Sequence, residues 1–296
     1  QGRAGGAFRL GISGVPGVGK STFIESLGQH VIAQGHRVAV LAVDPSSPKT
    51  GGSILGDKTR MEQLSRHAEA FIRPSPSGGT LGGVTRRTRD VMVAVEAAGF
   101  DVVFVEVHFD HPDGFVVFVE TVGVGQSETA VAGMTDMVVL LLAPGAGDDL
   151  QGIKKGIVEL ADLIVVNKAD GDLLPAAERA RRDYAAALHL LRPAPGAWQT
   201  GVMTCSAIED RGVAAVWTAA QDFRAAAEAT GRLSESRADQ AAAWMWDEVT
   251  ESLLDELRGD PASAARIAEL EQAERDGTTS AAAAAKALLA GFRGAS

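Results

Sequence analysis

The sequence has a single cysteine, a single tyrosine and an aromatic content of only 5% over 296 residues. One cysteine, Cys205, excludes a disulfide within the chain and any metal site with several cysteine ligands, and it favours a reducing compartment. The longest apolar runs, such as Met137–Pro144, are far shorter than the ~18 residues of a membrane span. We therefore expect no membrane association and a cytoplasmic location, or the mitochondrial matrix if the source is eukaryotic.

Positive charge is also scarce, because 28 Lys and Arg stand against 38 Asp and Glu, which gives a net charge of −10 at pH 7. A nucleic-acid binder needs a positive surface potential, so this balance argues against nucleic acid as a partner. The hydrophobic content of 46% indicates a large core, and the 34 glycines indicate many loops that make their contacts through backbone groups.

Short apolar runs alternate with amphipathic stretches over residues 8–232. The runs are Phe8–Ile12, Arg37–Val43, Asp101–Val107, Phe115–Glu120, Met137–Leu142, Leu163–Val166 and Val202–Thr204. Helical stretches such as Ser21–Gln34 and Arg86–Ala98 lie between most of them. This alternation predicts an α/β domain with a mostly parallel sheet flanked by helices.

Residues 233–296 have no strand pattern and form a separate helical region. Asp260-Pro261 and Asp276-Gly277 divide it into helices, and Trp244, Val249 and Leu253 recur at helical spacing. Apolar helices of this kind need a surface to pack against. Two interpretations stay open at this point, namely docking onto the chain's own α/β domain and a subunit interface.

A complete phosphate-binding motif lies between the first apolar run and the first helix. Its residues are Gly14, Val15, Pro16, Gly17, Val18, Gly19, Lys20 and Ser21, and Thr22 continues into the helix. Glycines let backbone N–H groups surround a phosphate chain, and the helix N-terminus adds partial positive charge. Lys20 is the expected β- and γ-phosphate contact, and the Ser21 hydroxyl is a candidate Mg²⁺ ligand.

A second motif, Asn167-Lys168-Ala169-Asp170, follows the run Leu163–Val166. A carboxylate at its last position accepts hydrogen bonds from guanine N1–H and the exocyclic amine, a donor pair that adenine lacks. Ser206, Ala207 and Ile208 come after a later strand and are the expected backbone contacts to the base. Cys205 is interpreted as a buried core residue rather than a nucleophile. Together the motifs predict GTP and GDP as ligands.

Carboxylates at other strand ends are candidate magnesium ligands. Asp44 closes the second apolar run, Asp57 follows in a glycine-rich segment, and Glu120 precedes Thr121-Val122-Gly123. We expect Glu120 to hold Mg²⁺ through water and the Gly123 N–H to contact the γ-phosphate. Lys20, Asp57, Glu120 and Gly123 are thus the candidate catalytic residues.

These residues resemble the MeaB/ArgK-type P-loop GTPases, the family of the methylmalonic aciduria type A protein. The resemblance runs from Phe8 to Phe292. Its most specific parts are Gly14–Thr22, Val43–Met61, Glu120–Glu128, Gly145–Ile157 and Asn167–Asp170. It implies a GTPase chaperone of an adenosylcobalamin-dependent methylmalonyl-CoA mutase that gates cofactor loading and protects the mutase. It also implies a homodimer joined by the C-terminal helices, with residues 1–7 as the remnant of an N-terminal extension.

The resemblance further assigns roles by position. Asp44, Asp57 and Glu120 match the acidic magnesium-site residues. Gly145–Lys155 matches a mobile loop that couples the nucleotide state to the mutase, with Asp148 and Lys154 as its polar contacts.

The sequence departs from the family pattern between residues 107 and 120. Gly99–Glu106 is nearly repeated by Gly114–Glu120, and only the second copy runs directly into the Gly123 segment. We expect the second copy to form the strand that carries the magnesium-site carboxylate, with the first copy as an extra or edge strand. Glu106 remains the alternative to Glu120.

Two rival functions stay open. His108, Asp110 and His111 are potential metal ligands, so a metallocentre-assembly GTPase of the nickel-delivery type is the runner-up. The other is a nucleotide-dependent dimeric switch with negligible hydrolysis of its own, because no catalytic Gln or Arg finger is evident.

Overall fold

The computed structural model describes residues 6–43, 61–75, 81–107, 132–144, 160–190 and 198–295. The chain divides into two compact units, residues 1–240 and 241–296, whereas the sequence had suggested a division at residue 232. Across the described residues, none of the helices combines the length and apolarity needed to cross a membrane.

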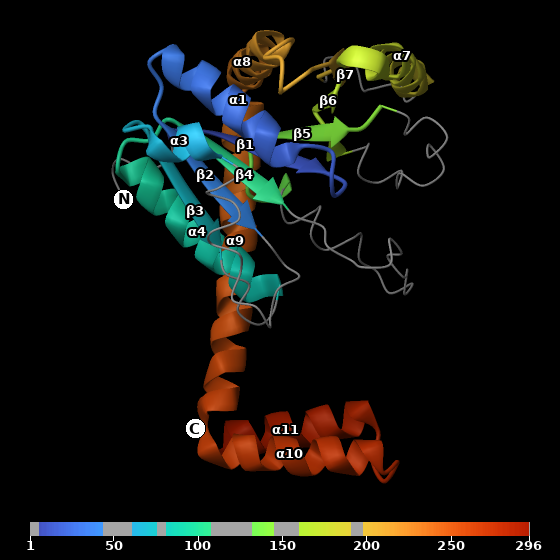
Figure 1. The fold of residues 1–296 in the computed structure, drawn as a ribbon. Helices are drawn as coiled ribbons and strands as arrows, with labels where there is room; N and C mark the ends of the chain where they lie inside the picture. The colour runs from blue at the N-terminus through green and yellow to red at the C-terminus, as the bar shows by residue number, and fades with distance from the viewer. Residues whose placement is uncertain are drawn as a thin grey trace. The chain divides into compact units, whose positions relative to one another are not determined.

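The first unit is built on a seven-stranded sheet in the order β3-β2-β4-β1-β5-β6-β7 (Figure 1). The strands are β1 (Phe8–Gly14), β2 (Val38–Val43), β3 (Ala70–Ser75), β4 (Val102–Val107), β5 (Met137–Leu142), β6 (Leu163–Val166) and β7 (Gly201–Thr204). Every neighbouring pair in it is parallel. The predicted α/β class with a parallel sheet is therefore confirmed.

Helices cover both faces of this sheet. They are α1 (Lys20–Ala33), α3 (Glu62–Arg66), α4 (Leu81–Ala97), α7 (Leu174–Leu190) after the short η2 (Gly171–Leu173), and α8 (Val213–Ala229). On one face, Phe23 of α1 and Trp217 of α8 join the core formed with Leu10 of β1. On the other, Tyr184 of α7 is buried with Ile164 of β6. Continuous apolar strands are needed because both faces are covered.

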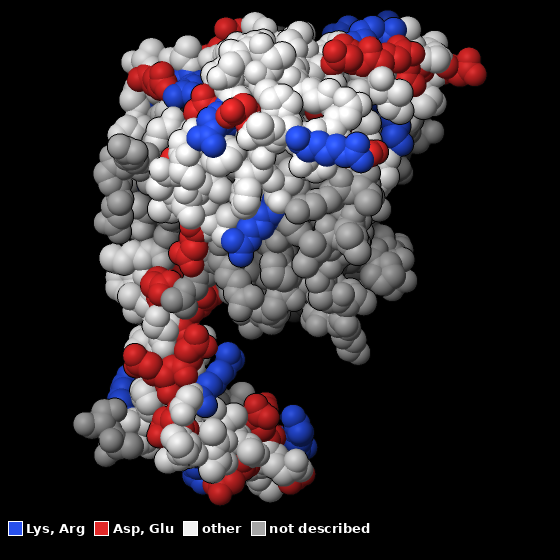
Figure 2. All heavy atoms as spheres, turned by 60° about the vertical axis from the view of Figure 1, so that its left-hand side comes forward, with Lys and Arg blue, Asp and Glu red and all other residues white. Residues whose placement is uncertain are grey.

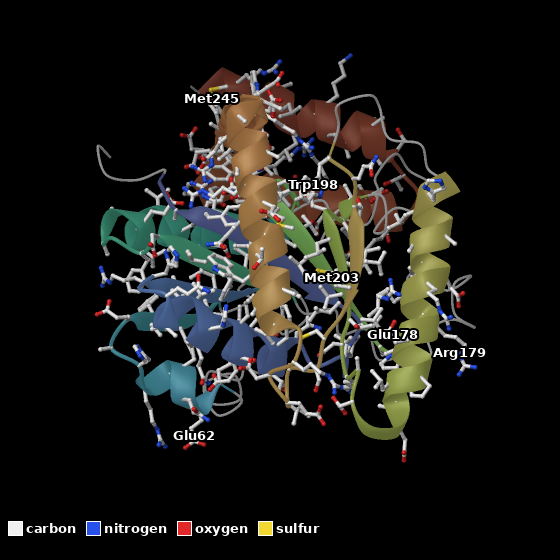
Figure 3. The ribbon with its side chains drawn as sticks, turned by 90° about the horizontal axis from the view of Figure 1, so that it is seen from above. Glu62, Glu178, Arg179, Trp198, Met203 and Met245 are labelled. Carbon is white, nitrogen blue, oxygen red and sulfur yellow. The ribbon has the colours of Figure 1, made fainter. Side chains whose placement is uncertain are left out.

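Helix α7 also contacts the last strand of the sheet. Thr204 of β7 donates its Oγ1–H to Glu178 Oε1 of α7 at 3.0 Å, and Figure 3 labels Glu178 on α7 and Met203, the residue before Thr204, on β7. Trp198, just before β7, donates Nε1–H to the carbonyl of Asp162 at 2.9 Å. These polar contacts hold β7 at an edge of the sheet, where β6 is its one neighbour among the described strands.

The first copy of the repeated segment forms a central strand, so the expectation of an extra or edge strand for it is wrong. Strand β4 pairs with β1 on one side, where Glu106 lies beside Ile12, and with β2 on the other, where Glu106 lies beside Ala42. The second copy lies outside the described residues. A central strand covered by helices on both faces needs apolar residues on each face, and Val102, Val103, Phe104 and Val105 of β4 are all buried.

Three aspartates at the amino-terminal edge of the sheet make the same kind of hydrogen bond. Asp101, Asp136 and Asp162 each come one residue before a strand, and each accepts a backbone N–H from a neighbouring segment. The bonds run from Arg37 N to Asp101 at 2.7 Å, from Arg9 N to Asp136 at 2.8 Å and from Val138 N to Asp162 at 2.9 Å. A carboxylate thus provides the acceptor for an amide at the margin of the sheet.

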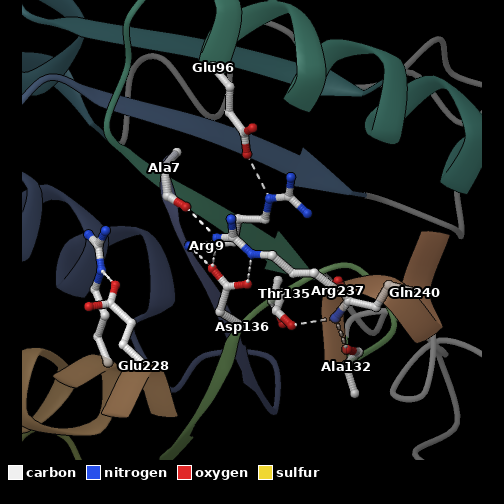
Figure 4. Close-up of polar contacts among 10 residues, drawn as sticks. Ala7, Arg9, Glu96, Ala132, Thr135, Asp136, Glu228, Arg237 and Gln240 are labelled. Atoms are coloured by element: carbon white, nitrogen blue, oxygen red, sulfur yellow. Dashed lines mark hydrogen bonds and ion pairs between the residues drawn. The ribbon is translucent and has the colours of Figure 1, made fainter. Parts of the chain in front are cut away.

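The start of helix α9 (Arg232–Gly259) is held to this edge by a buried polar network (Figure 4). Arg237 donates to Asp136 at 2.6 and 2.8 Å and to the carbonyl of Ala7 at 2.6 Å. Gln240 donates to the carbonyls of Thr135 at 2.8 Å and Ala132 at 3.2 Å. These bonds explain why the first unit extends to residue 240 rather than ending where α9 begins.

The second unit contains the rest of α9 with α10 (Pro261–Arg275) and α11 (Ala281–Ala295). Asp260 caps α10 by accepting the Ser263 N–H at 2.8 Å, and Pro261 occupies the first turn, as the sequence break predicted. Basic and acidic side chains are interspersed over this unit in Figure 2. Large apolar side chains on α9 are exposed, and they are Met245, Trp246, Val249, Leu253 and Leu254.

Candidate functional site

The loop between β1 and α1 has a backbone that demands glycine at two points. A Cβ on Gly14 would lie 2.6 Å from the carbonyl oxygen of Leu141, and one on Gly19 would lie 2.8 Å from Nδ2 of Asn167. Gly19 also has φ 93°, in the left-handed region, and directly precedes the first residue of α1. The loop therefore ends with the helix N-terminus facing it, as a phosphate site requires.

Two side chains at the start of α1 point back into this region. Lys20 Nζ donates to the carbonyls of Gly14 at 2.8 Å and Val15 at 3.4 Å. The Ser21 hydroxyl donates to Oε1 of Glu106 at 3.2 Å, and Glu106 is fully buried at the end of β4. The structure thus brings together an ammonium, a hydroxyl and a carboxylate beside the glycine loop.

The segment after β6 is bonded directly to the glycine loop. Asn167 Nδ2 donates to the carbonyl of Val18 at 3.0 Å, and Lys168 Nζ donates to that of Gly17 at 2.7 Å. Lys168 has φ 58°, which a non-glycine residue adopts rarely. Motifs separated by about 150 positions in the chain therefore form one continuous site because β1, β5 and β6 are neighbours in the sheet.

The segment after β7 completes the site. Ser206 Oγ donates to Oδ2 of Asp170 at 2.5 Å, and the Ala207 N–H donates to Oδ1 of Asn167 at 3.3 Å. Ile208 is 78% exposed. Cys205 is buried in the core, as predicted, and burial together with nearby Asp210 raises its pKa to about 12. A thiol with so high a pKa is protonated at neutral pH, which fits the interpretation of Cys205 as a core residue.

Several predicted site residues lie outside the described residues. They are Asp44, Asp57, Glu120, Gly123, Asp148 and Lys154, and with them His108, Asp110 and His111. Their roles stay predictions. Within the part of the chain that the structure describes, no group of three or more His, Cys, Asp or Glu side chains is placed to hold a metal ion.

Sequence reasoning missed two residues that organise this site. Arg211 donates from Nη2 to the carbonyl of Ala169, inside the Asn167–Asp170 motif, and Asp210 accepts from the Ser26 hydroxyl of α1 at 2.9 Å. The only local signal is that both residues precede Gly212, whose φ of 84° marks a turn at the start of α8. Nothing in the linear sequence links that turn to residue 169.

A protein-family model described as methylmalonyl-CoA mutase-associated GTPase MeaB matches this chain over residues 1–108 and 109–262. The break between its segments falls between the two copies of the repeat. A protein of Caulobacter vibrioides named putative GTPase is 56% identical over 97% of this chain and 84% of its own length. The GTPase ArgK of Escherichia coli is 52% identical over 86% of this chain and 72% of its own length.

Two further comparisons extend the similarity to animals and to a solved structure. The mouse protein named methylmalonic aciduria type A homolog, mitochondrial, is 46% identical over 97% of this chain and 66% of its own length. The crystal structure of a LAO/AO transport system kinase has 38% identity and a TM-score of 0.70, and it covers 99% of this chain and 84% of that one. The chain therefore belongs to the methylmalonyl-CoA mutase-associated GTPase MeaB family and is a P-loop enzyme that hydrolyses GTP.

Proposed function

We propose that this GTPase is a chaperone of an adenosylcobalamin-dependent methylmalonyl-CoA mutase, that it gates loading of the cofactor, and that it protects or reactivates the mutase. The observation that carries the proposal is the family match, whose description names the mutase, over residues 1–108 and 109–262. The relative in mouse, named after methylmalonic aciduria, supports the same partner.

Guanine selectivity is assigned to Asp170. Its carboxylate lies at the end of the motif that is bonded to the glycine loop, and Ser206 orients it through a bond of 2.5 Å. Two acceptor oxygens match the N1–H and exocyclic amine of guanine, whereas adenine leaves such a carboxylate unpaired. The backbone after β7, at Ala207 and Ile208, is assigned to the remaining edge of the base.

The phosphates are assigned to the backbone N–H groups of residues 14–22, except Pro16, which has none, and to Lys20, whose ammonium offsets the charge that develops on the γ-phosphate. Ser21 and Glu106 are hard oxygen donors in contact with each other, which fits Mg²⁺. A bound Mg²⁺ would supply further charge neutralisation at the phosphates. Asp44, Asp57 and Glu120 remain the other proposed magnesium-site residues, and Gly123 the proposed γ-phosphate contact.

Communication with the mutase is assigned to the loop Gly145–Lys155, with Asp148 and Lys154 as its polar contacts. The C-terminal helices are assigned to homodimer formation, supported by exposed apolar side chains on α9 such as Trp246, which is 65% exposed. An exposed apolar stripe on a helix is typical of an interface.

The first experiment compares GTP hydrolysis by the full chain with and without purified methylmalonyl-CoA mutase, with ATP as the control nucleotide. We expect turnover that is selective for GTP and that rises when the mutase is added. Turnover that is selective for GTP but unaffected by the mutase would contradict the proposed partner while leaving the GTPase assignment intact.

A further inference from the structure

Ala169, the residue before Asp170, is held at both its N–H and its carbonyl by the segment that follows β7. The Ala169 N–H donates to the carbonyl of Cys205 at 3.0 Å, and the Ala169 carbonyl accepts from Nη2 of Arg211. That carbonyl belongs to the planar peptide group that continues into Asp170. A bond to it therefore limits rotation of the backbone that carries the Asp170 side chain.

Arg211 is itself fixed by the turn in which it lies. It exchanges two backbone hydrogen bonds with Ser206, of 2.8 and 3.0 Å, and its Nη1 lies 3.3 Å from Oε2 of Glu209. Between them Asp210 has φ 52° and is bonded to Ser26 of α1. The turn is thus closed on itself and joined to the helix that begins at the phosphate loop.

The same turn orients the Asp170 carboxylate directly. Ser206 Oγ donates to Oδ2 of Asp170 at 2.5 Å and accepts the Glu209 N–H at 3.2 Å. Ser206 is completely buried. The carboxylate and the peptide group that precedes it are therefore both held by residues 206–211, one through Ser206 and the other through Arg211.

We propose that Arg211 is a positioning residue for guanine selectivity, acting through the Ala169 carbonyl to hold Asp170 in the orientation that pairs with two donors of the base. This rests on the assignment of Asp170 as the guanine-reading residue. A guanidinium suits the task because one nitrogen of its planar fork donates to the Ala169 carbonyl while another forms an ion pair with Glu209, whereas an ammonium is a point charge. The arginine contacts the backbone of the motif rather than the reacting groups.

The test compares binding of GDP and IDP, because inosine lacks the exocyclic amine that only a correctly oriented carboxylate can use. Isothermal titration with the full chain gives the ratio of the two affinities for the wild type, Arg211→Ala and Arg211→Lys. We expect Arg211→Ala to weaken GDP binding about tenfold and IDP binding less, so that the ratio falls. Arg211→Lys should keep part of the ratio, because an ammonium still donates to a carbonyl but lacks the fork geometry.

Two further variants separate the possible failures. Arg182→Ala is the matched control, because Arg182 also donates to a backbone carbonyl, that of Glu178, but at an exposed position of α7. The ratio of GDP to IDP affinity of this variant should equal that of the wild type. Asp170→Ala should make GDP and IDP bind equally. If Asp170→Ala retains the preference for GDP, the proposed guanine site is wrong. The role of Arg211 is overturned by either of two results, provided that Asp170→Ala removes the preference for GDP. In the first, both Arg211 variants keep the wild-type ratio of affinities. In the second, both variants lose GDP and IDP binding in parallel.

Discussion

The Ser21 hydroxyl at the start of α1 donates to the Glu106 carboxylate at the end of β4, over 3.2 Å. This contact joins the phosphate-binding motif to the first copy of the repeated segment. It arises because β4 is the direct neighbour of β1, with Glu106 beside Ile12 in the parallel register. The carboxylate beside the phosphate loop in the described structure is therefore Glu106.

Glu106→Gln should reduce Mg²⁺-dependent GTP turnover by about 10- to 100-fold, as expected for a group that supports a bound metal. The amide keeps the size of the side chain and an acceptor for Ser21 but removes the negative charge. Steady-state hydrolysis at increasing Mg²⁺ concentration measures the effect. Glu120→Gln, the same change in the second copy, is the comparison, and a loss confined to Glu120→Gln would assign the role to the second copy.

Arg237→Met should destabilise the first unit by about 3–5 kcal/mol, because it leaves a buried carboxylate without its cation. The Asp136 side chain has no exposed area, and Arg237 binds it through two nitrogens. Urea unfolding measures the loss. Arg66→Ala removes an ion pair whose arginine is 76% exposed, and it should cost less than about 1 kcal/mol.

A double variant tests whether the buried charge is the cause. Asp136→Asn combined with Arg237→Met removes both charges, so the combined loss should be smaller than the sum of the two single losses. Strictly additive losses would mean that the two side chains stabilise the fold independently of each other.

Asp162→Asn should flatten the pH dependence of stability between about pH 4 and about pH 6. Burial raises the pKa of Asp162 from 3.8 to about 6, although the Val138 N–H and the charge of Arg232 lower it. The folded protein thus holds this proton more tightly than the unfolded chain, so ionisation of Asp162 costs stability as the pH rises through that window. Urea midpoints at several pH values test this. Asp172→Asn, at an exposed aspartate, should leave the wild-type slope.

Trp246→Glu should convert a dimer into monomers if the α9 surface is the subunit interface. Trp246, Val249 and Leu253 recur at helical spacing and are all at least 40% exposed. Sedimentation equilibrium measures the mass. Asp255→Lys changes the charge on the opposite face of the same helix, about two and a half turns from Trp246, and should leave the dimer intact. A wild-type chain that is monomeric at all concentrations would contradict the proposed homodimer.

Much of the candidate site follows from local sequence. Residues 14–21 and 167–170 are recognisable because each chemical task needs particular residue types directly after a buried strand, and the structure places both motifs at such strand ends. The edge strand β3 was not predicted, since Arg73 and Pro74 interrupt its apolar pattern. An edge strand tolerates proline because one of its sides, among the described residues, has no strand partner.

The α/β class, the phosphate and guanine motifs and the helical C-terminal region can be predicted from the sequence, because periodicity, glycines and caps act over a few residues. Only the tertiary structure placed the Val102–Val107 copy between β1 and β2, because both copies have nearly the same pattern and strand pairing depends on residues distant in the chain. It likewise decided that Arg211 binds Ala169 and that Arg237 binds Asp136. Those partners are separated by 42 and 101 positions, and no local rule connects them.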